Sequence, residues 1–232
     1  MFKSGRIRDV TGGYEQGCEK IVVAGMEKGV GATHFSILMA NYYAEVLHKK
    51  TAVIDCGNDN DYFCLKEMVT FPNSQKRQIQ NYGIRKAVAK DCEKRWKPDG
   101  FKLGKVFYFL HVPRQNMDEI FLKKFECIIM DLGNNYRKYK YEAGMCEKRF
   151  LMATVCPWKL DVFVQSYQEY FEMYSKDEWN YVFSFGDDES VEYLRKTLKI
   201  KFQRLPIIPD PFQIERGQLD AVKKIIWEES VR

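Results

Sequence analysis

Short apolar runs alternate with amphipathic segments along most of the chain. Seven runs have the length of strands, and most are rich in β-branched or aromatic residues. The segments between them place apolar residues at helical spacing, as at Phe35, Leu38 and Tyr42. Strands that are apolar throughout and alternate with helices are typical of a parallel sheet covered on both faces. We therefore predict a three-layer α/β fold with a mainly parallel sheet of about seven strands.

The order of these segments is regular enough to assign bounds to most of them. We expect strands at residues 18–26, 51–57, 105–112, 126–135, 148–158, 179–186 and 200–212, and helices at 32–49, 61–70, 117–125, 161–176, 188–199 and 213–230. The sequence shows no repeat or linker, so residues 1–232 are expected to form one domain, with a flexible or extended leader at 1–17. The last helix has a short apolar stripe and an acidic end, which favour packing onto the domain over membrane binding.

Composition and charge narrow the possible classes of protein. The 232 residues are 45% hydrophobic and 30% charged, with a net charge of +5, which is ordinary for a globular protein. The basic residues are scattered, and this favours a solvated surface. The stretch 76–97, in which Tyr82 and Trp96 interrupt basic residues, leaves contact with nucleic acid or an acidic partner open.

The seven cysteines include no C-x-x-C pair and no spacing typical of a zinc site. Cys56, Cys127 and Cys156 lie in or beside apolar strand-like runs, where a thiol behaves as a small hydrophobe. An odd count without a secretory leader suggests a reducing compartment, and no run of about 18 apolar residues occurs. We therefore expect a cytoplasmic protein with no integral membrane segment.

The segment with the clearest chemistry follows the first apolar run and reads EKGVGATH, residues 27 to 34. Gly29 and Gly31 let backbone N–H groups curve around an anion, and a helix that begins near Ala32 directs its positive dipole end there. A standard phosphate-binding loop has a lysine at the position of Ala32, followed by a Mg²⁺-binding hydroxyl at the position of Thr33. Taken alone, the segment also fits an ordinary glycine turn between a strand and a helix.

Two further strands end in carboxylates. Asp55 closes the run TAVID and Asp131 closes ECIIMD. A carboxylate at the end of a buried aliphatic run is unfavourable unless something pairs with it, and a hydrated Mg²⁺ is a natural partner. Either residue alone is also compatible with a helix cap or a turn. Because ligands bind at the carboxyl ends of parallel strands, the two acids and the glycine segment together favour a nucleotide–Mg²⁺ site.

Together these residues resemble the ParA/MinD-type, deviant-Walker branch of the P-loop ATPases. KGVGATH corresponds to the phosphate-binding loop, AVIDCG to the second strand, ECIIMDLG to the Walker B strand and LPIIPDPF to a proline-containing segment that flanks the base. The resemblance spans most of the chain. Within that group, GVGAT without the loop lysine is most similar to the CpaE/TadZ-like proteins of Tad-type pilus assembly.

The resemblance implies binding of ATP or ADP with Mg²⁺. By position, the phosphates would be surrounded by Lys28, Gly29, Val30, Gly31, Ala32, Thr33 and His34, Mg²⁺ would be held by Thr33, Asp55 and Asp131, and the base would lie against Pro209, Asp210 and Pro211. The resemblance also implies a homodimer that depends on nucleotide, with protein partners in a pilus or secretion assembly.

Three positions depart from the family pattern. Ala32 replaces the phosphate-binding lysine, Glu27 aligns with the lysine that reaches across the dimer, and Gly57 aligns with the aspartate that activates water. The sequence therefore predicts a slow or inactive ATPase that acts as a nucleotide-responsive localisation or assembly factor. Two alternatives stay open, namely a nucleotide-free scaffold that keeps the fold and a DNA-partitioning ATPase that uses the basic segment.

Overall fold

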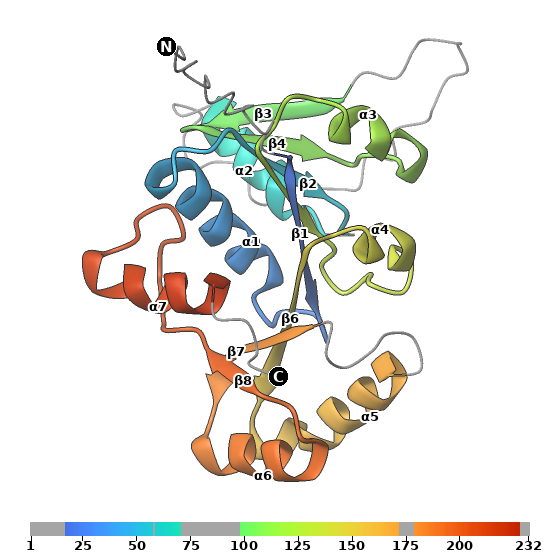
Figure 1. The fold of residues 1–232 in the computed structure, drawn as a ribbon, viewed down its shortest axis with the longest axis vertical. Helices are drawn as coiled ribbons and strands as arrows, with labels where there is room; N and C mark the ends of the chain where they lie inside the picture. Colours follow the sequence, from blue (N-terminus) through green and yellow to red (C-terminus); the bar gives the residue numbers. More distant parts are fainter. Residues whose placement is uncertain (1–16, 58, 71–97, 172–178, 228–232) are drawn as a thin grey trace, which may run out of the picture.

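The computed structural model describes residues 17–57, 59–70, 98–171 and 179–227. Within these residues eight strands form one sheet, in the order β3-β4-β2-β5-β1-β6-β7-β8 (Figure 1). The strands are β1 Glu19–Gly25, β2 Thr51–Asp55, β3 Asp99–Leu103, β4 Val106–Leu110, β5 Cys127–Asp131, β6 Lys148–Val155, β7 Asn180–Gly186 and β8 Phe202–Arg204. Neighbouring strands are parallel except β3 and β4, which pair in antiparallel fashion.

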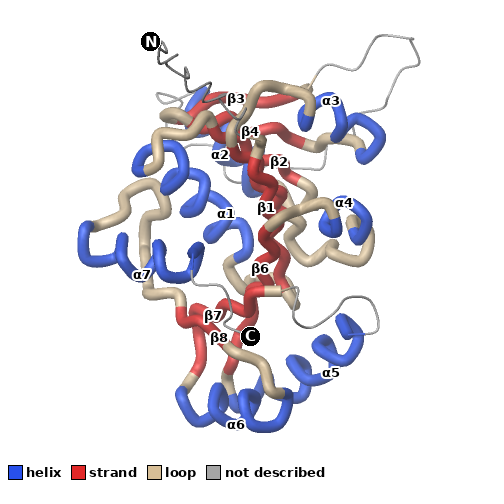
Figure 2. The backbone as a smooth tube through the Cα atoms, viewed as in Figure 1, coloured by secondary structure: helices blue, strands red, loops and turns tan. Residues whose placement is uncertain are grey.

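Helices cover both faces of this sheet (Figure 1, Figure 2). They are α1 Ala32–Asn41, α2 Asp61–Thr70, α3 Met117–Phe121, α4 Lys140–Gly144, α5 Leu160–Phe171, α6 Asp188–Leu198 and α7 Arg216–Trp227, with a π-helical segment at Tyr42–Val46 and 3-10 helices at Arg114–Asn116 and Pro157–Lys159. Buried residues of α1, α2 and α7 belong to one core, and those of α3, α4, α5 and α6 belong to the other. The predicted three-layer α/β fold is therefore confirmed.

The central strand β1 shows how the sequence serves both cores. Ile21 and Val23 pack with α1 and α7, whereas Val22 and Ala24 pack with the helices of the opposite face. Successive side chains of a strand point to opposite faces, so a strand buried on both sides must be apolar at every position. All four residues are fully buried, which explains why this run carries no alternation of polar and apolar residues.

The strand that the apolar pattern does not predict is β3, at the antiparallel edge of the sheet. Phe101 stacks on Tyr108 of β4 with ring centroids 5.0 Å apart, and Gly104, with a φ of 58°, permits the tight turn between the two strands. The remaining positions of β3 are mostly exposed. An edge strand with few apolar residues leaves no continuous apolar run in the sequence. The sheet therefore has eight strands, where the apolar pattern predicted about seven.

Several predicted elements are shorter in the structure, and two of them differ most clearly. The strand expected at 200–212 is limited to the three residues of β8, because Pro206, Pro209 and Pro211 provide no backbone N–H for a ladder. The helix expected at 32–49 is α-helical only to Asn41 and continues as the π-helical segment to Val46. The leader, apart from its last residue, and the basic segment 76–97 lie outside the described residues.

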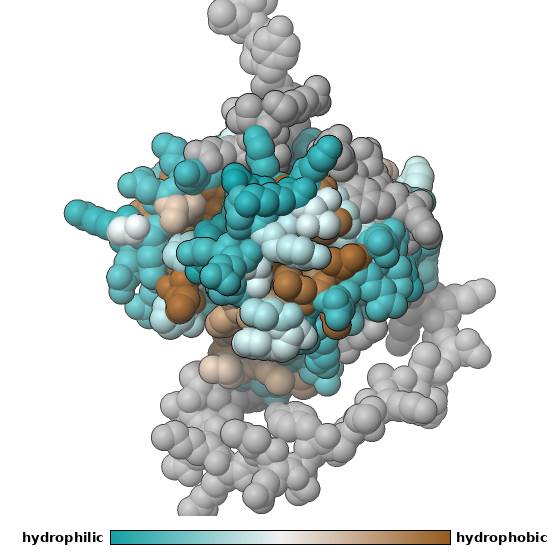
Figure 3. All heavy atoms as spheres, turned by 90° about the horizontal axis from the view of Figure 1, so that it is seen from below, coloured by the Kyte–Doolittle hydropathy of each residue, from teal (hydrophilic) through white to brown (hydrophobic). Residues whose placement is uncertain are grey.

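The closing helix α7 packs onto the domain, as predicted, through buried Val222, Ile225 and Ile226. No helix in the described ranges has the length and apolarity needed to cross a membrane. Cys56, Cys127 and Cys156 are buried free thiols, which confirms their expected place beside the core. Seen from the end that carries α5 and α6, the surface is mostly hydrophilic with separate hydrophobic areas (Figure 3), an ordinary pattern for a folded domain.

Candidate functional site

The sheet topology creates one position where a ligand is expected. Strand β1 lies between β5 and β6, in the middle of the sheet. The helix that follows β1 packs on one face, whereas α5, which follows β6, packs on the opposite face. In open parallel sheets such a divergence leaves a crevice at the carboxyl ends of the strands, and ligands bind there. The ends of β1, β2 and β5 carry the glycine turn, Asp55 and Asp131.

The turn between β1 and α1 requires glycine at two positions. Gly29 and Gly31 have φ angles of 82° and 92°, in the left-handed region, and a Cβ added to either would meet no atom within 4 Å. Both glycines are therefore demanded by the backbone, and the space beside them is open. Gly25 is required for close packing, because a Cβ there would lie only 2.7 Å from the side chain of buried Val30.

Helix α1 begins directly behind this turn, at Ala32. Its N-cap is Gly31, no side chain caps the helix, and its first turn holds no acidic residue. The first N–H groups of any helix lack partners within the helix and carry the positive end of its dipole. Thr33 and His34 lie half-buried in this first turn. The predicted phosphate-binding segment therefore combines open space with backbone donors.

Asp131, at the end of β5, is a buried carboxylate with several donors. Its Oδ1 accepts a hydrogen bond from the Gly133 N–H at 2.9 Å, and its Oδ2 accepts one from the Tyr62 hydroxyl at 2.9 Å. The Thr33 side chain lies near enough to lower the pKa of Asp131 as well. Burial nevertheless raises the pKa of Asp131, and these hydrogen bonds only partly oppose that effect. The structure thus brings together Thr33 and Asp131, two of the three predicted metal-binding residues.

The third, Asp55, lies at the end of β2, directly opposite Asp131 in the strand register. Its Oδ1 accepts a hydrogen bond from the Gly57 N–H at 3.0 Å, but its Oδ2 is buried without a hydrogen-bond partner among the described residues. Burial, and then the charge of Asp131, raise the pKa of Asp55 from 3.8 to about 7. Asp55 is 5% exposed, so bulk water has little access to its carboxylate and does little to stabilise the negative charge.

The two acids fit a Mg²⁺ ion better than a metal held by the protein alone. No group of three or more His, Cys, Asp or Glu side chains in the described part of the chain has the arrangement of a metal cluster. Mg²⁺ keeps several waters and is usually bound by one or two carboxylates together with phosphates of a substrate. The unpartnered Oδ2 of Asp55, beside the ionisable Asp131, offers this kind of partial site.

Tyr62 is the residue that sequence reasoning missed. It lies in the first turn of α2, is 2% exposed, and donates its hydroxyl to Asp131. The helix at 61–70 was expected, yet nothing in its spacing distinguishes a tyrosine that only fills the core from one that also donates to a carboxylate. A buried tyrosine hydroxyl generally needs a partner, and this rule is the one signal that pointed toward such a contact.

Two lysines lie beside the glycine turn, and each is paired with a carboxylate. Lys28 Nζ is 2.6 Å from Asp59 Oδ1, in the loop after β2. Lys159 Nζ, in the 3-10 helix after β6, is 2.5 Å from Glu27 Oε2. Glu27 aligns with the lysine that reaches across the dimer in the resembling family, and here it contacts a lysine of its own chain. Ala32 is 7% exposed and brings no charge to the turn.

The segment predicted to border the base contacts the C-terminal end of α1, away from the glycine turn. Asn41 Nδ2, at the last residue of the helix, donates to the Pro211 carbonyl oxygen at 3.2 Å. At about 1.5 Å per residue, this contact is roughly 14 Å along the helix axis from the glycine turn. Asp210 forms a local turn in which its Oδ1 accepts from the Phe212 N–H at 2.9 Å. A role of Pro209, Asp210 and Pro211 at the base stays a prediction.

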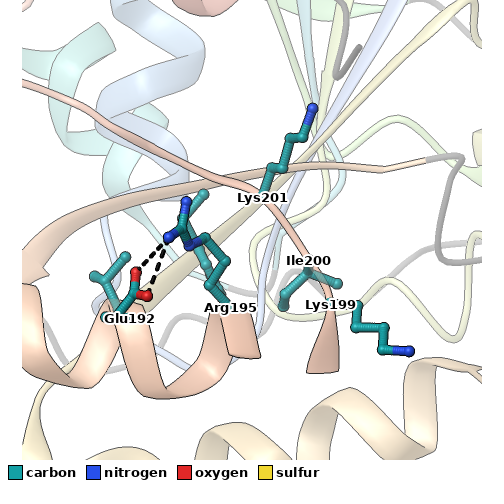
Figure 4. A pocket seen from close by; sticks show the side chains of 7 residues that line it. Glu192, Arg195, Lys199, Ile200 and Lys201 are labelled. Atoms are coloured by element: carbon teal, nitrogen blue, oxygen red, sulfur yellow. Dashed lines mark hydrogen bonds and ion pairs between the residues drawn. The ribbon is translucent and has the colours of Figure 1, made fainter. Parts of the chain in front are cut away.

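An open pocket lies between α6 and β8, away from this edge of the sheet (Figure 4). Arg195 is paired with Glu192, at 2.8 Å between Nη2 and Oε2. The side chains of Lys199 and Lys201 point away from one another, so their charges do not converge on one point (Figure 4). This arrangement does not resemble a phosphate site, and the carboxyl edge of β1, β2 and β5 remains the candidate.

Comparison with known proteins supports the fold. No protein-family model and no curated protein matches the sequence. The structure is similar to a plasmid partition protein from Borrelia burgdorferi B31 bound to AMPPNP, at 13% identity and a TM-score of 0.55 over 90% of this chain and 97% of the other. It is also similar to MinD from Aquifex aeolicus, at 16% identity and a TM-score of 0.56, over 90% of this chain and 97% of the other. The MinC:MinD complex of that organism matches at 14% identity and a TM-score of 0.59, over 90% of this chain and 96% of the other. At these identities the likeness shows the fold alone, and the fold is that of the MinD and plasmid partition proteins.

Proposed function

We propose that the carboxyl edge of the sheet binds ATP or ADP together with Mg²⁺, and that hydrolysis there is slow or absent. In this proposal the backbone of Gly29 to His34 surrounds the phosphates, while Thr33, Asp55 and Asp131 hold Mg²⁺ and its water shell. The similar plasmid partition protein from Borrelia burgdorferi was solved with AMPPNP bound, which makes a nucleotide the natural ligand to test.

The observation that carries the proposal is the buried, unpartnered Oδ2 of Asp55. A buried carboxylate oxygen without a donor is unfavourable, and a bound ion, an ordered water or a catalytic role is a common explanation for one in a native protein. Asp55 lies opposite Asp131, next to a left-handed glycine turn with open space. A divalent cation would satisfy both acids, and it would attract the phosphates that the helix N-terminus also favours.

Slow hydrolysis follows from the groups around the turn. Ala32 provides no charge for the terminal phosphate, and Gly57 provides no carboxylate to position water. Asp59 is the nearest acidic replacement in that loop, but Lys28 engages it. Backbone donors and Mg²⁺ are sufficient for binding, whereas transition-state stabilisation normally needs a further cation.

We further propose that nucleotide favours a dimer, which docks onto a pilus or secretion assembly in the cytoplasm. The support for this part is the resemblance of the GVGAT segment to CpaE/TadZ-like proteins. Physically, a ligand that binds the dimer more tightly than the monomer shifts the equilibrium toward the dimer without being hydrolysed. Among the similar structures, one MinD protein was solved in complex with MinC.

Calorimetric titration of the full chain with AMPPNP, with and without Mg²⁺, tests nucleotide binding. We expect saturable binding with Mg²⁺ and a large loss of affinity without it. At one hundred times the dissociation constant, the ligand should stabilise the fold by about 2.7 kcal/mol. The variant D55N should lose most of the Mg²⁺ dependence, whereas D220N, which removes an exposed carboxylate from α7, should bind as the wild type does.

The alternatives predict different results in the same assay. An unchanged melting curve and no heat at millimolar Mg-AMPPNP would contradict nucleotide binding and favour the nucleotide-free scaffold. Binding to DNA that weakens steeply with salt would instead favour the DNA-partitioning ATPase. Size measurements with and without Mg-AMPPNP then test whether the ligand drives dimer formation.

A further inference from the structure

Among the described residues, the glycine turn is surrounded by more acidic than basic groups. They place two lysines and five carboxylates at this edge, the latter being Glu27, Asp55, Asp59, Asp61 and Asp131. Both lysines are already engaged, Lys28 by Asp59 and Lys159 by Glu27. A polyphosphate that approaches the turn therefore meets an excess of negative charge. A lysine must change its partner before it can contact the phosphates.

The two ion pairs differ in exposure. The side chains of Lys28 and Asp59 are 73% and 42% exposed, whereas those of Lys159 and Glu27 are 38% and 24% exposed. An exposed ion pair contributes little net stability, because water and salt screen it and both side chains lose freedom. Hydrogen bonds from ammonium groups to phosphate are among the strong ones. Phosphate can therefore displace Asp59 from Lys28 more easily than it can displace Glu27 from Lys159.

Lys28 is also the better placed of the two lysines. It immediately precedes Gly29, whose left-handed backbone opens the space for the phosphates. Asp59 lies four residues after Asp55, in the loop that follows β2. The ion pair thus joins the two loops between which the ligand is proposed to bind. The hydrogen bond and charge of Asp59 raise the pKa of Lys28, so the lysine stays cationic while it is held.

We propose that Lys28 supplies the bound polyphosphate with the positive charge that position 32 lacks, and that Asp59 holds Lys28 away until a phosphate displaces it. The inference rests on the nucleotide binding proposed above. In the resting chain the ammonium group contacts Asp59. In the ligand complex it contacts phosphate oxygens, and the loop that carries Asp59 is released from the glycine turn. Lys28 is then a ligand-binding residue, and Asp59 is a positioning residue that acts through it.

A double-mutant cycle with Mg-AMPPNP tests this exchange of partners. The proteins are the full-length wild type, K28M, D59N and K28M/D59N, with D61N and K28M/D61N as the matched controls. Asp61 is an exposed carboxylate at the start of α2 that influences Lys28 only by its charge. Removing any nearby carboxylate should tighten anion binding somewhat, and D61N measures that general effect. We expect K28M to weaken binding about tenfold and D59N to tighten it about tenfold beyond D61N.

The coupling between the two positions decides the result. In the K28M background, D59N should add no more than D61N does, because no lysine remains to be released. Equal effects of D59N and D61N in both backgrounds would overturn the exchange and leave nucleotide binding intact. Binding by D59N but not by the wild type would support the exchange, with the resting chain held closed. If neither protein binds, nucleotide binding and the exchange both fail.

A second measurement is independent of nucleotide. The reactivity of the Lys28 amine toward an acylating reagent, followed by mass spectrometry, reports whether Asp59 holds it. D59N should raise this reactivity several-fold, since a lost ion pair lowers the pKa of the amine toward its ordinary value, while D61N should change it little. Equal reactivity in the wild type and D59N would overturn the pairing. Lys28 and Asp61 are exposed and Asp59 is half-buried, so unchanged melting temperatures would show that all three changes leave folding intact.

Discussion

The two ends of the sheet treat their buried and half-buried carboxylates in opposite ways. At the amino end, Glu19 of β1 accepts hydrogen bonds from Tyr43, Lys49 and Lys148, each at 2.9 Å. At the carboxyl end, Asp55 of β2 has one oxygen without a partner among the described residues. Burial opposes ionisation at both residues. At Glu19 the three hydrogen-bond donors outweigh burial, so its pKa is lowered. The pKa of Asp55 is raised.

This difference separates a carboxylate whose partners all lie within the fold from one that is left with an unpartnered oxygen, as the proposed Mg²⁺ site requires. Lys148 also lies over the ring of Trp227, at 3.6 Å from the centroid, so the network at Glu19 fastens α7 to the amino end of the sheet. Every group in that network finds its partner within the chain. At the carboxyl end the fold instead tolerates two adjacent acids, and such an imbalance is typical of a site that is completed by a cation.

The largest expected effect concerns Asp55. Because its pKa is raised to about 7 in the folded chain, folding is favoured by protonation, and this contribution is lost as the pH rises from about 4 toward 8. Without divalent cations, the free energy of unfolding should fall by up to about 4 kcal/mol over that interval through this group. D55N should remove the part of the slope that Asp55 contributes and be more stable than the wild type at pH 8 in urea denaturation.

Mg²⁺ provides the control for this measurement. The ion should stabilise the wild type at pH 8 and have little effect on D55N. A wild-type protein as stable at pH 8 as at pH 5 in EDTA would break the contrast between the two ends, because Asp55 would then be satisfied without a ligand.

A smaller effect of opposite pH sign is expected at Glu19. Its pKa is lowered in the folded chain, so its contribution is present above the unfolded value of 4.5 and is lost as the pH falls through the folded pKa. E19Q should lower the free energy of unfolding at pH 7 by about 2 kcal/mol, because two lysines lose their shared partner in a partly buried position. Chemical denaturation measures the change.

The matched control is E147Q, at the same end of the sheet. Glu147 accepts a hydrogen bond from the Lys20 backbone N–H at the surface, at 2.6 Å, and a glutamine can accept the same bond. Its effect should stay below about 1 kcal/mol. Equal losses in E19Q and E147Q would show that the Glu19 network adds nothing beyond surface charge.

The fold was predictable because burial on both faces leaves a direct trace in the sequence. The run from Ile21 to Ala24 is apolar at every position, as a central parallel strand must be. The same logic fails for β3, where Phe101 and Leu103 pack on the sheet but their neighbours are exposed. Edge strands and the proline-rich segment after β8 depend on backbone hydrogen bonding, which residue hydrophobicity does not report.

The candidate site was predictable only in part. Positive φ angles at Gly29 and Gly31, and the adjacency of Asp55 and Asp131, follow from residue type and from parallel register. Contacts between side chains that are far apart in sequence do not follow from either. The ion pairs of the two lysines beside the turn, and the hydroxyl that Tyr62 donates, depend on how loops and rotamers settle in three dimensions.

The smallest expected effect sharpens the contrast within the carboxyl end itself. Y62F removes the hydroxyl that Asp131 accepts at 2.9 Å while it keeps the buried ring. Loss of a hydrogen bond to an ionised carboxylate should lower the free energy of unfolding by about 1.5 kcal/mol at pH 8, and by less as Asp131 takes up a proton at lower pH. Urea denaturation across the range from pH 4 to pH 8 in EDTA follows this change. A loss that stays constant over the whole range would mean that the contribution of the hydroxyl does not depend on the charge of Asp131.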